Sequence, residues 1–289
     1  MEIKKASKQE AKLRIGLSGA SGFGKTYSAL LLAYGMTGDW SKICVIDTEN
    51  NSASLYSNLG NYNVIDLKAP YNPEKFIDAL KLAENSGMTT LVLDSITSEW
   101  QGSGGCLEIH EQLGGRWQDW AKVTPRHQAF IDAILQSKCH VITCVRRKIE
   151  YSLDTDSNGR MKVTKLGTKE QTREGFEYEL TVNFEIINEN HLSKASKDRT
   201  GLFMNKPEFV INSSTGVKLI SWARSTLTKV DLQQKIVDCM TIKELTDLYN
   251  NNLVLAKTVE QEFVNKKNLL NNLLTNISSN GNGTYPKAS

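Results

Sequence analysis

The sequence predicts an α/β protein built on a mostly parallel, doubly covered β-sheet. Short apolar runs alternate with helix-length segments through the first half of the chain. Two runs, TTLVLDS at 89–95 and HVITCV at 140–145, are continuously apolar, which is typical of strands covered on both faces. A glycine-rich turn at 19–26 joins a strand-like run to a helix-like one. Such alternation indicates parallel strands connected by crossover helices.

Composition restricts the class of protein. The hydrophobic fraction of 39% and the charged fraction of 23% are those of a folded globular chain. The net charge of +3 is too small for a global field, so contact with nucleic acid would need a local basic strip. No apolar run approaches the ~20 residues of a membrane span, and no signal peptide is recognisable. We therefore expect a soluble cytoplasmic protein with no membrane partner.

The five cysteines form no C-x-x-C pair and show no partnering histidine spacing: Cys44, Cys106, Cys139, Cys144 and Cys239. Cys44 and Cys144 lie within apolar runs, where a thiol is most often a small core side chain. The sequence therefore predicts reduced thiols and no zinc site.

The elements before residue 146 follow from periodicity and boundary residues. The 73–87 segment begins with proline and ends with glycine, which are common helix boundaries. Strands are expected at 13–19, 42–48, 89–95 and 140–145, and helices at 25–36, 73–87 and 119–137.

The pattern changes after residue 146. Residues 151–174 are polar and contain the turn signal DSNG, so a long loop is expected. FEYELTVNFEII alternates like an antiparallel strand, and HLSKAS and EFVI resemble edge strands. From about 217 the sequence is helical. The expected divisions are an N-terminal arm (1–12), a core (13–226), a C-terminal helical region (227–277) and a disordered tail (278–289).

Residues 19–26, GASGFGKT, fit the phosphate-binding pattern G-x-x-x-x-G-K-[ST] between a strand and a helix. Glycines let backbone amides and the helix N-terminus surround a phosphate chain. Lys25 is expected to reach the β- and γ-phosphates and Thr26 to ligate Mg²⁺. The sequence thus predicts ATP and Mg²⁺ as cofactors, with these nucleotide-binding residues: Gly19, Ala20, Ser21, Gly22, Phe23, Gly24, Lys25, Thr26 and Tyr27.

Two acidic residues are candidates for the chemistry of hydrolysis. Asp94 ends an apolar strand and is expected to serve the Mg²⁺ ion, the alternative being an aspartate that only ends a strand or caps a helix. The next residue is Ser95, so the chain is not expected to belong to the class of ATPases that have a catalytic glutamate at that position. Glu49, in VIDTEN, is the candidate to orient the attacking water, and an exposed loop glutamate is the alternative.

The order of the motifs resembles that of the ATPase core of RecA/RadA recombinases. These motifs are the phosphate-binding turn (the P-loop), IDTE, LVLDS and an apolar strand that ends in Arg146-Arg147-Lys148. The chain is most similar to compact phage-encoded RecA-like ATPases of single-strand annealing and recombination, over about 13–225. The resemblance implies that Glu49 is catalytic and that Tyr56 stacks on adenine. Bacterial RecA has a γ-phosphate-sensing glutamine where this chain has Arg146, which is a candidate to touch the phosphate directly.

The resemblance also implies two disordered loops that face DNA inside a filament. The first is 95–120, with Trp100, Trp117 and Trp120, two of which are expected to pack on the core. The second is 149–175, for which a merely solvated loop is the alternative. Cations neutralise phosphates and aromatic rings stack on bases, which suits single strands. The residues expected to contact DNA are Arg160, Lys162, Lys165, Lys169 and Arg173.

Residues 195–203, ASKDRTGLF, place Lys197 and Arg199 on either side of one aspartate. Spacing alone indicates a solvated turn. The resemblance implies a strand whose K-x-K or K-x-R cations reach the ATP site of the neighbouring subunit. Lys197 and Arg199 would then stabilise charge on the γ-phosphoryl group in trans.

These inferences predict a Mg²⁺-dependent ATPase that binds single-stranded DNA, assembles head to tail, and acts in recombination or annealing. A single-strand-binding protein is a further candidate partner, and a phage-encoded chain would act in the host cytoplasm. The alternatives are a hexameric DNA motor of the helicase or packaging type, a small-molecule kinase, and a nucleotide-switched scaffold. The C-terminal helices suit a cap, a DNA gateway or a protein-docking module equally well.

Overall fold

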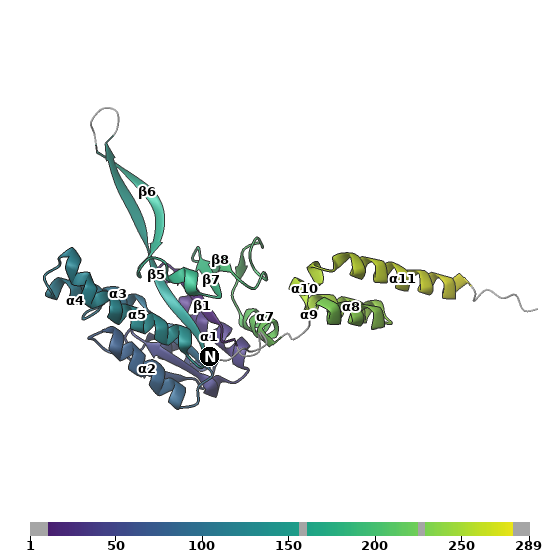
Figure 1. Ribbon diagram of the computed structural model, residues 1–289, viewed down its shortest axis with the longest axis horizontal. Helices are drawn as coiled ribbons and strands as arrows, with labels where there is room; N and C mark the ends of the chain where they lie inside the picture. Colours follow the sequence, from purple (N-terminus) through teal and green to yellow (C-terminus); the bar gives the residue numbers. More distant parts are fainter. Residues whose placement is uncertain (1–10, 156–160, 225–228, 280–289) are drawn as a thin grey trace, which may run out of the picture. The chain divides into compact units, whose positions relative to one another are not determined.

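The computed structural model describes residues 11–155, 161–224 and 229–279 (Figure 1). Its central sheet has the strand order β3-β2-β4-β5-β1-β7-β8-β9. The strands from β3 to β7 in this order run parallel, and β8 and β9 are antiparallel at one edge. This confirms the predicted mostly parallel sheet with antiparallel edge strands. The strands are β1 Arg14–Gly19, β2 Ile43–Asp47, β3 Asn63–Asp66, β4 Thr90–Asp94, β5 His140–Thr155, β7 Val182–Ile186, β8 Leu192–Asp198 and β9 Phe209–Val210.

Helices cover the parallel part of the sheet. Alternate strand residues such as Ile46 and Leu91 join a buried cluster with Phe76 and Phe130 of the packed pair α2 and α5. Because successive side chains of a strand point to opposite faces, the intervening buried residues face the other side, and α1 contacts the same strands. The helices here are α1 Lys25–Thr37, α2 Pro73–Asn85, α3 Thr97–Gln101, α4 Cys106–Gln112, α5 Trp120–Gln136, α6 Phe176–Glu179 and α7 Ser213–Arg224.

Two glycines allow α7 to approach α1 closely. A Cβ atom on Gly35 of α1 would lie 1.9 Å from the carbonyl oxygen of Ser213. A Cβ atom on Gly216 of α7 would lie 2.2 Å from the carbonyl oxygen of Leu32. The two backbones are therefore in contact, and this contact supports the helix that begins at the phosphate-binding turn.

The predicted long loop at 151–174 is largely wrong. β5 continues to Thr155 and pairs antiparallel with β6, Met161–Glu170, which forms a projecting two-stranded arm (Figure 1). Hydrogen bonds between the two strands satisfy the backbone without an apolar face, so the polar sequence was no evidence against strands.

Two further expectations need correction. The 95–120 segment is not an irregular loop, because it contains α3, α4 and the 3₁₀ turn Trp117–Asp119. The FEYELTVNFEII run is not one antiparallel strand, since α6 occupies its start and β7 pairs parallel with β1. Buried Phe176 and Leu180 hold α6 against the core. Alternation of side chains indicates a strand, but it does not specify the direction of the neighbouring strand.

The helices after residue 229 form a separate core. Contacts divide the chain into a unit at Ala11–Ile220 and a second that contains the C-terminal helices. Leu232, Ile236, Leu245 and Phe263 are buried together in the second unit. Its helices are α8 Lys229–Asp238, α9 Ile242–Asn251, α10 Leu253–Lys257 and α11 Glu260–Ser279. None of the helices in the described part of the chain has the length and hydropathy needed to cross a bilayer.

The buried guanidinium of Arg14 ties β1 to the end of α5. It donates hydrogen bonds to the carbonyl oxygens of Leu135 at 2.9 Å, Ser137 at 2.6 Å and Cys139 at 2.8 Å. Burial lowers the pKa of Arg14 to about 10, which leaves it charged at neutral pH. One arginine thus closes the connection between α5 and β5.

We predict that Arg14→Met lowers the free energy of unfolding by about 2–4 kcal/mol, because it leaves several buried carbonyl groups without a donor. Urea denaturation of the purified chain measures the change. Lys12→Met, at an exposed neighbouring position, is the control and should change stability by less than about 0.5 kcal/mol. Equal stability of the two variants would contradict the bracing role.

Candidate nucleotide-binding site

The phosphate-binding turn lies between β1 and α1, as its sequence predicts. Gly24 has φ of 85°, a left-handed conformation that favours glycine, and α1 begins directly after it. A Cβ atom on Gly24 would also lie 2.8 Å from Nδ1 of His191. His191 Nδ1 donates to the carbonyl oxygen of Phe23 at 2.8 Å, so the β7–β8 turn contacts the phosphate-binding turn.

Lys25 lies folded under this turn. Its side chain is buried, and Nζ donates to the carbonyl oxygens of Gly19 at 3.1 Å and Ala20 at 2.9 Å. Charged phosphate oxygens are stronger acceptors than these neutral carbonyls. The ammonium group is therefore placed to transfer from the turn to a bound phosphate chain.

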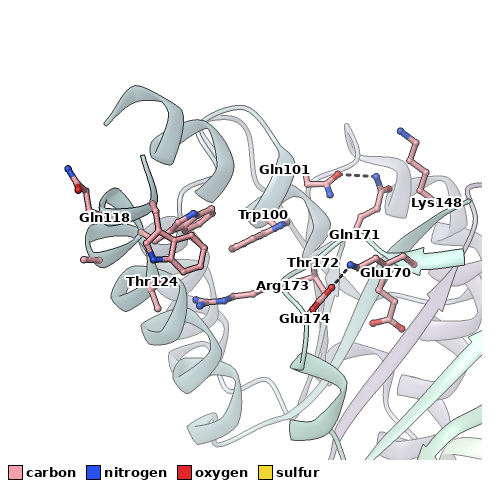
Figure 2. Close-up of a pocket in the computed structure, with 14 residues that line it drawn as sticks. Trp100, Gln101, Gln118, Thr124, Lys148, Glu170, Gln171, Thr172, Arg173 and Glu174 are labelled. Carbon is pink, nitrogen blue, oxygen red and sulfur yellow. Dashed lines mark hydrogen bonds and ion pairs between the residues drawn. The ribbon is translucent and has the colours of Figure 1, made fainter. Parts of the chain in front are cut away.

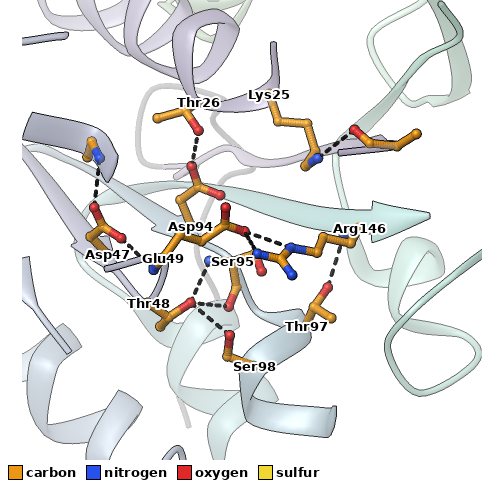
Figure 3. A network of polar contacts seen from close by, with 12 residues as sticks. Lys25, Thr26, Asp47, Thr48, Glu49, Asp94, Ser95, Thr97, Ser98 and Arg146 are labelled. Atoms are coloured by element: carbon orange, nitrogen blue, oxygen red, sulfur yellow. Dashed lines mark hydrogen bonds and ion pairs between the residues drawn. The ribbon is translucent and has the colours of Figure 1, made fainter. Parts of the chain in front are cut away.

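Asp94 and Thr26 meet at the carboxyl end of the sheet (Figure 3). The Asp94 residue is only 1% exposed. The Thr26 hydroxyl donates to its Oδ2 atom, whereas its Oδ1 atom has no hydrogen-bond partner among the described residues. Burial raises the pKa of Asp94 to about 6, although the Thr26 hydrogen bond opposes the rise. A carboxylate and a hydroxyl are the hard oxygen ligands that Mg²⁺ prefers. The two residues fit a magnesium site.

Glu49 and Arg146 form an ion pair beside Asp94 (Figure 3). Oε1 of Glu49 accepts from Nε of Arg146 at 2.9 Å and from Nη2 at 2.8 Å. Asp47 stabilises the turn that follows β2 by accepting from the backbone amides of Glu49 at 2.6 Å and Ala53 at 2.7 Å. The sequence placed Glu49 and Arg146 separately near the γ-phosphate. The structure shows that each is the partner of the other.

Tyr27 and Tyr56 lie close to each other beside α1. Their ring centroids are 5.7 Å apart with an interplanar angle of 62°. Tyr27 is exposed and Tyr56 is half-buried in the 3₁₀ helix Ser52–Leu59. The stacking of Tyr56 on adenine stays a prediction.

Lys197 and Arg199 converge on the short helix α6. Lys197 Nζ donates to the carbonyl oxygens of Glu177 at 2.9 Å and of Tyr178, and Arg199 Nη2 donates to Tyr178 at 2.7 Å. Asp198 organises the following turn by accepting from the amides of Thr200 and Phe203, both at 2.7 Å. ASKDRTGLF is therefore the end of β8 followed by an ordered turn, and its two cations both donate to carbonyl oxygens of α6. Their action on a neighbour's nucleotide stays a prediction.

A pocket of about 1140 Å³ lies between the helices after β4 and the base of the β5–β6 arm (Figure 2). Trp100, Trp117 and Trp120 line it together with Lys148, Lys169 and Arg173. Trp117 is 89% exposed, whereas the rings of Trp100 and Trp120 are half-buried and stack 5.7 Å apart. The structure thus brings the two segments that the sequence associated with DNA to one place.

Not all of the predicted DNA-contacting residues are described. Lys169 and Arg173 line the pocket, and Lys169 pairs with Glu174. Arg160 and the side chains of Lys162 and Lys165 lie outside the part of the chain that is described. Lys148 was not among the residues predicted from the sequence, although the basic run at 146–148 was a signal for it. Nor were His191 and Asp47, whose contacts only the fold supplies.

We predict that Asp94→Asn raises the melting temperature of the nucleotide-free protein more at about pH 8 than at about pH 5. The pKa of Asp94 is raised from 3.8 to about 6 on folding, so the folded chain binds the proton more tightly. Ionisation therefore destabilises the folded state as pH rises through this window, and the asparagine amide cannot ionise.

Thermal melts in the presence of a metal chelator, repeated across this pH range, measure the effect. Asp78→Asn, on the exposed face of α2, is the matched control and should show no such trend. A difference that is independent of pH would contradict the ionisation argument.

The site can be compared with known proteins. A family model described as an AAA domain matches residues 11–212, which span β1 to β9 and include both sides of the nucleotide site. No curated protein matches the chain. The matched segment contains the P-loop, Asp94 and Glu49, and an AAA domain indicates a nucleotide-dependent ATPase. The chain belongs to the AAA domain family.

Proposed function

We propose that this chain is a Mg²⁺-dependent, RecA-like ATPase that binds single-stranded DNA and acts in recombination or annealing. The observation that carries the proposal is the pocket in which three tryptophans face three cations on the unit that holds the P-loop. Aromatic rings and cations side by side suit unpaired bases and their phosphates, because every base has a face to stack and every nucleotide carries a charge.

Bound ATP reorganises the ion pair between Glu49 and Arg146. Arg146 exchanges Glu49 for the γ-phosphate, and Lys25 leaves its two carbonyl acceptors for the β- and γ-phosphates. Thr26 and Asp94 would hold a Mg²⁺ ion, which would supply positive charge to neutralise the phosphates. Glu49 is then available to accept a proton from the attacking water, whose oxygen bonds to the γ-phosphorus as the bond to the β-phosphate oxygen breaks.

The nucleotide site and the pocket are joined by two short connections. β5 carries Arg146 at the nucleotide edge and Lys148 in the pocket, two residues further on. α3 carries Thr97, whose hydroxyl accepts from the Arg146 amide at 3.0 Å, and Trp100 in the pocket. A movement of Arg146 on ATP binding therefore reaches both walls of the pocket. This supports coupling between ATP binding and DNA binding.

We predict that Trp117→Ala weakens binding of oligo(dT) by about 5–100-fold, the value of one base–aromatic stack, while Trp117→Phe retains most of the affinity. Arg173→Gln weakens binding and lowers the slope of log affinity against log salt by about 0.7. Fluorescence anisotropy with ATP and Mg²⁺ present measures both.

Lys206→Gln, exposed and outside the pocket, is the matched charge control and should bind like wild type. Lys25→Ala, which removes the phosphate-binding ammonium, should bind DNA equally with and without ATP. Wild-type affinity in both Trp117→Ala and Arg173→Gln would refute the pocket as the DNA site.

The trans role of Arg199 gives a prediction for mixed assemblies. Glu49→Gln should lower turnover by about 10²–10⁴ and Arg199→Ala by about 10³–10⁵, each with little change in nucleotide affinity of the isolated chain. Mixed one to one, the two variants should recover activity at about a quarter of the head-to-tail interfaces, where intact Glu49 meets intact Arg199.

Steady-state ATPase assays at high protein concentration, with oligo(dT) present, measure the recovery. A mixture of Glu49→Gln and Lys25→Ala is the control and should stay inactive. Glu49 and Lys25 of one site come from the same subunit, so no interface in this mixture contains both residues intact. Full turnover by Arg199→Ala alone, or an inactive mixture, would refute the trans contribution.

A further inference from the structure

A second polar cluster, unrelated to the nucleotide site, lies inside the helices behind the pocket. Glu99 of α3, Cys106 at the start of α4 and His127 of α5 are all buried, and their donor atoms lie within 4.8 Å of one another. Oε1 of Glu99 accepts from the Cys106 thiol at 3.0 Å and from His127 Nδ1 at 3.0 Å. Three separate helices thus direct a carboxylate, a thiol and an imidazole to one point.

The charge in this cluster needs an explanation. Glu99 is 0% exposed, and its only ion-pair partner among the described residues is His127, which is charged only when protonated. A buried carboxylate without a permanent cation is costly. A dication bound by a carboxylate, a thiolate and a neutral imidazole would instead make the cluster electrically neutral.

The local sequence brings the three groups together through a close backbone contact. A Cβ atom on Gly105 would lie 2.7 Å from the carbonyl oxygen of Glu99 and 2.9 Å from that of Ser98. Only a glycine therefore fits where the chain turns back from α3 and places Cys106 against Glu99. His127 lies on the α5 face that points toward the same turn.

We propose that Glu99, Cys106 and His127 bind one Zn²⁺ ion that braces α3, α4 and α5. A mixed sulfur, nitrogen and oxygen donor set favours Zn²⁺ over Mg²⁺ or Ca²⁺, which prefer oxygen alone. Three protein ligands leave one position of a tetrahedral ion for a water molecule. The site is independent of the proposed function, since no residue of the nucleotide site or the DNA pocket is a ligand.

Metal binding exchanges protons for the ion. The Cys106 thiol releases its proton to solvent and its sulfur bonds to zinc. The proton on Nδ1 of the neutral His127 ring moves to Nε2 by exchange with solvent, which frees the Nδ1 lone pair for the ion. Zinc affinity should therefore fall as the pH is lowered.

The ion would also set the position of the pocket wall. The centroids of the Trp100 and His127 rings lie 5.1 Å apart, and the Trp100 ring in turn stacks on that of Trp120. A fixed His127 holds this aromatic wall in place. Intrinsic tryptophan fluorescence consequently reports metal loading without any nucleotide or DNA.

The test is metal analysis of the full chain, purified without chelators, then stripped under reducing conditions and titrated with Zn²⁺ and with Co²⁺. Wild type should hold about one Zn²⁺ per chain, and cobalt should show a thiolate-to-metal charge-transfer band. Cys106→Ser should lose the band, and both Cys106→Ser and His127→Gln should bind Zn²⁺ at least about 10-fold more weakly.

Two controls isolate the site. Cys239→Ser removes a buried thiol in the other unit, and Asp94→Asn alters the magnesium site, and both should keep the stoichiometry and the cobalt band. Where a ligand variant does not fold, the wild-type titration still decides, through the band and a higher melting temperature with zinc. Stripped wild type that takes up no zinc, or an unchanged band in Cys106→Ser, would overturn the proposal and leave a hydrogen-bonded core cluster.

Discussion

Asp94 ends strand β4 with a buried carboxylate. One of its oxygens accepts from Thr26, and the other has no hydrogen-bond partner among the described residues. Burial raises its pKa to about 6, so the nucleotide-free protein holds an unfavourable group at the centre of its carboxyl edge. The surrounding elements are arranged around this group. The P-loop helix supplies Thr26. The turn after β2 supplies Glu49 and β5 supplies Arg146, and these two strands lie on either side of β4.

In the absence of nucleotide, the charged side chains of this site are bonded to other protein groups. Lys25 bonds to carbonyl oxygens of its own turn, and Arg146 bonds to Glu49. Each contact satisfies a charge in the absence of nucleotide, and the neutral carbonyl acceptors of Lys25 are weaker than phosphate oxygens. The site is therefore ordered without ligand, and a bound nucleotide would act by exchanging partners rather than by building new structure.

The same edge of the sheet continues into the aromatic pocket. β5 and α3 leave the nucleotide site side by side and contribute Lys148 and Trp100 to opposite parts of the pocket. Behind Trp100, the Glu99, Cys106 and His127 cluster joins the three helices that form the wall. The nucleotide site, the aromatic pocket and the Glu99, Cys106 and His127 cluster are thus neighbours in the fold, although their residues come from distant parts of the chain.

The parallel core and the residues of the phosphate-binding turn could be predicted from the sequence, because apolar runs and glycine spacing are local signals of burial and backbone conformation. The sequence also indicated Asp94 and Glu49 from their places at strand ends. It could not show the β5–β6 arm, because backbone pairing requires no apolar pattern. Only the tertiary structure brought Arg146 to Glu49, His191 to the P-loop, and Cys106 and His127 to Glu99. These contacts join residues far apart in the chain, and packing of the sheet and its helices decides them, since no spacing rule connects side chains on separate elements.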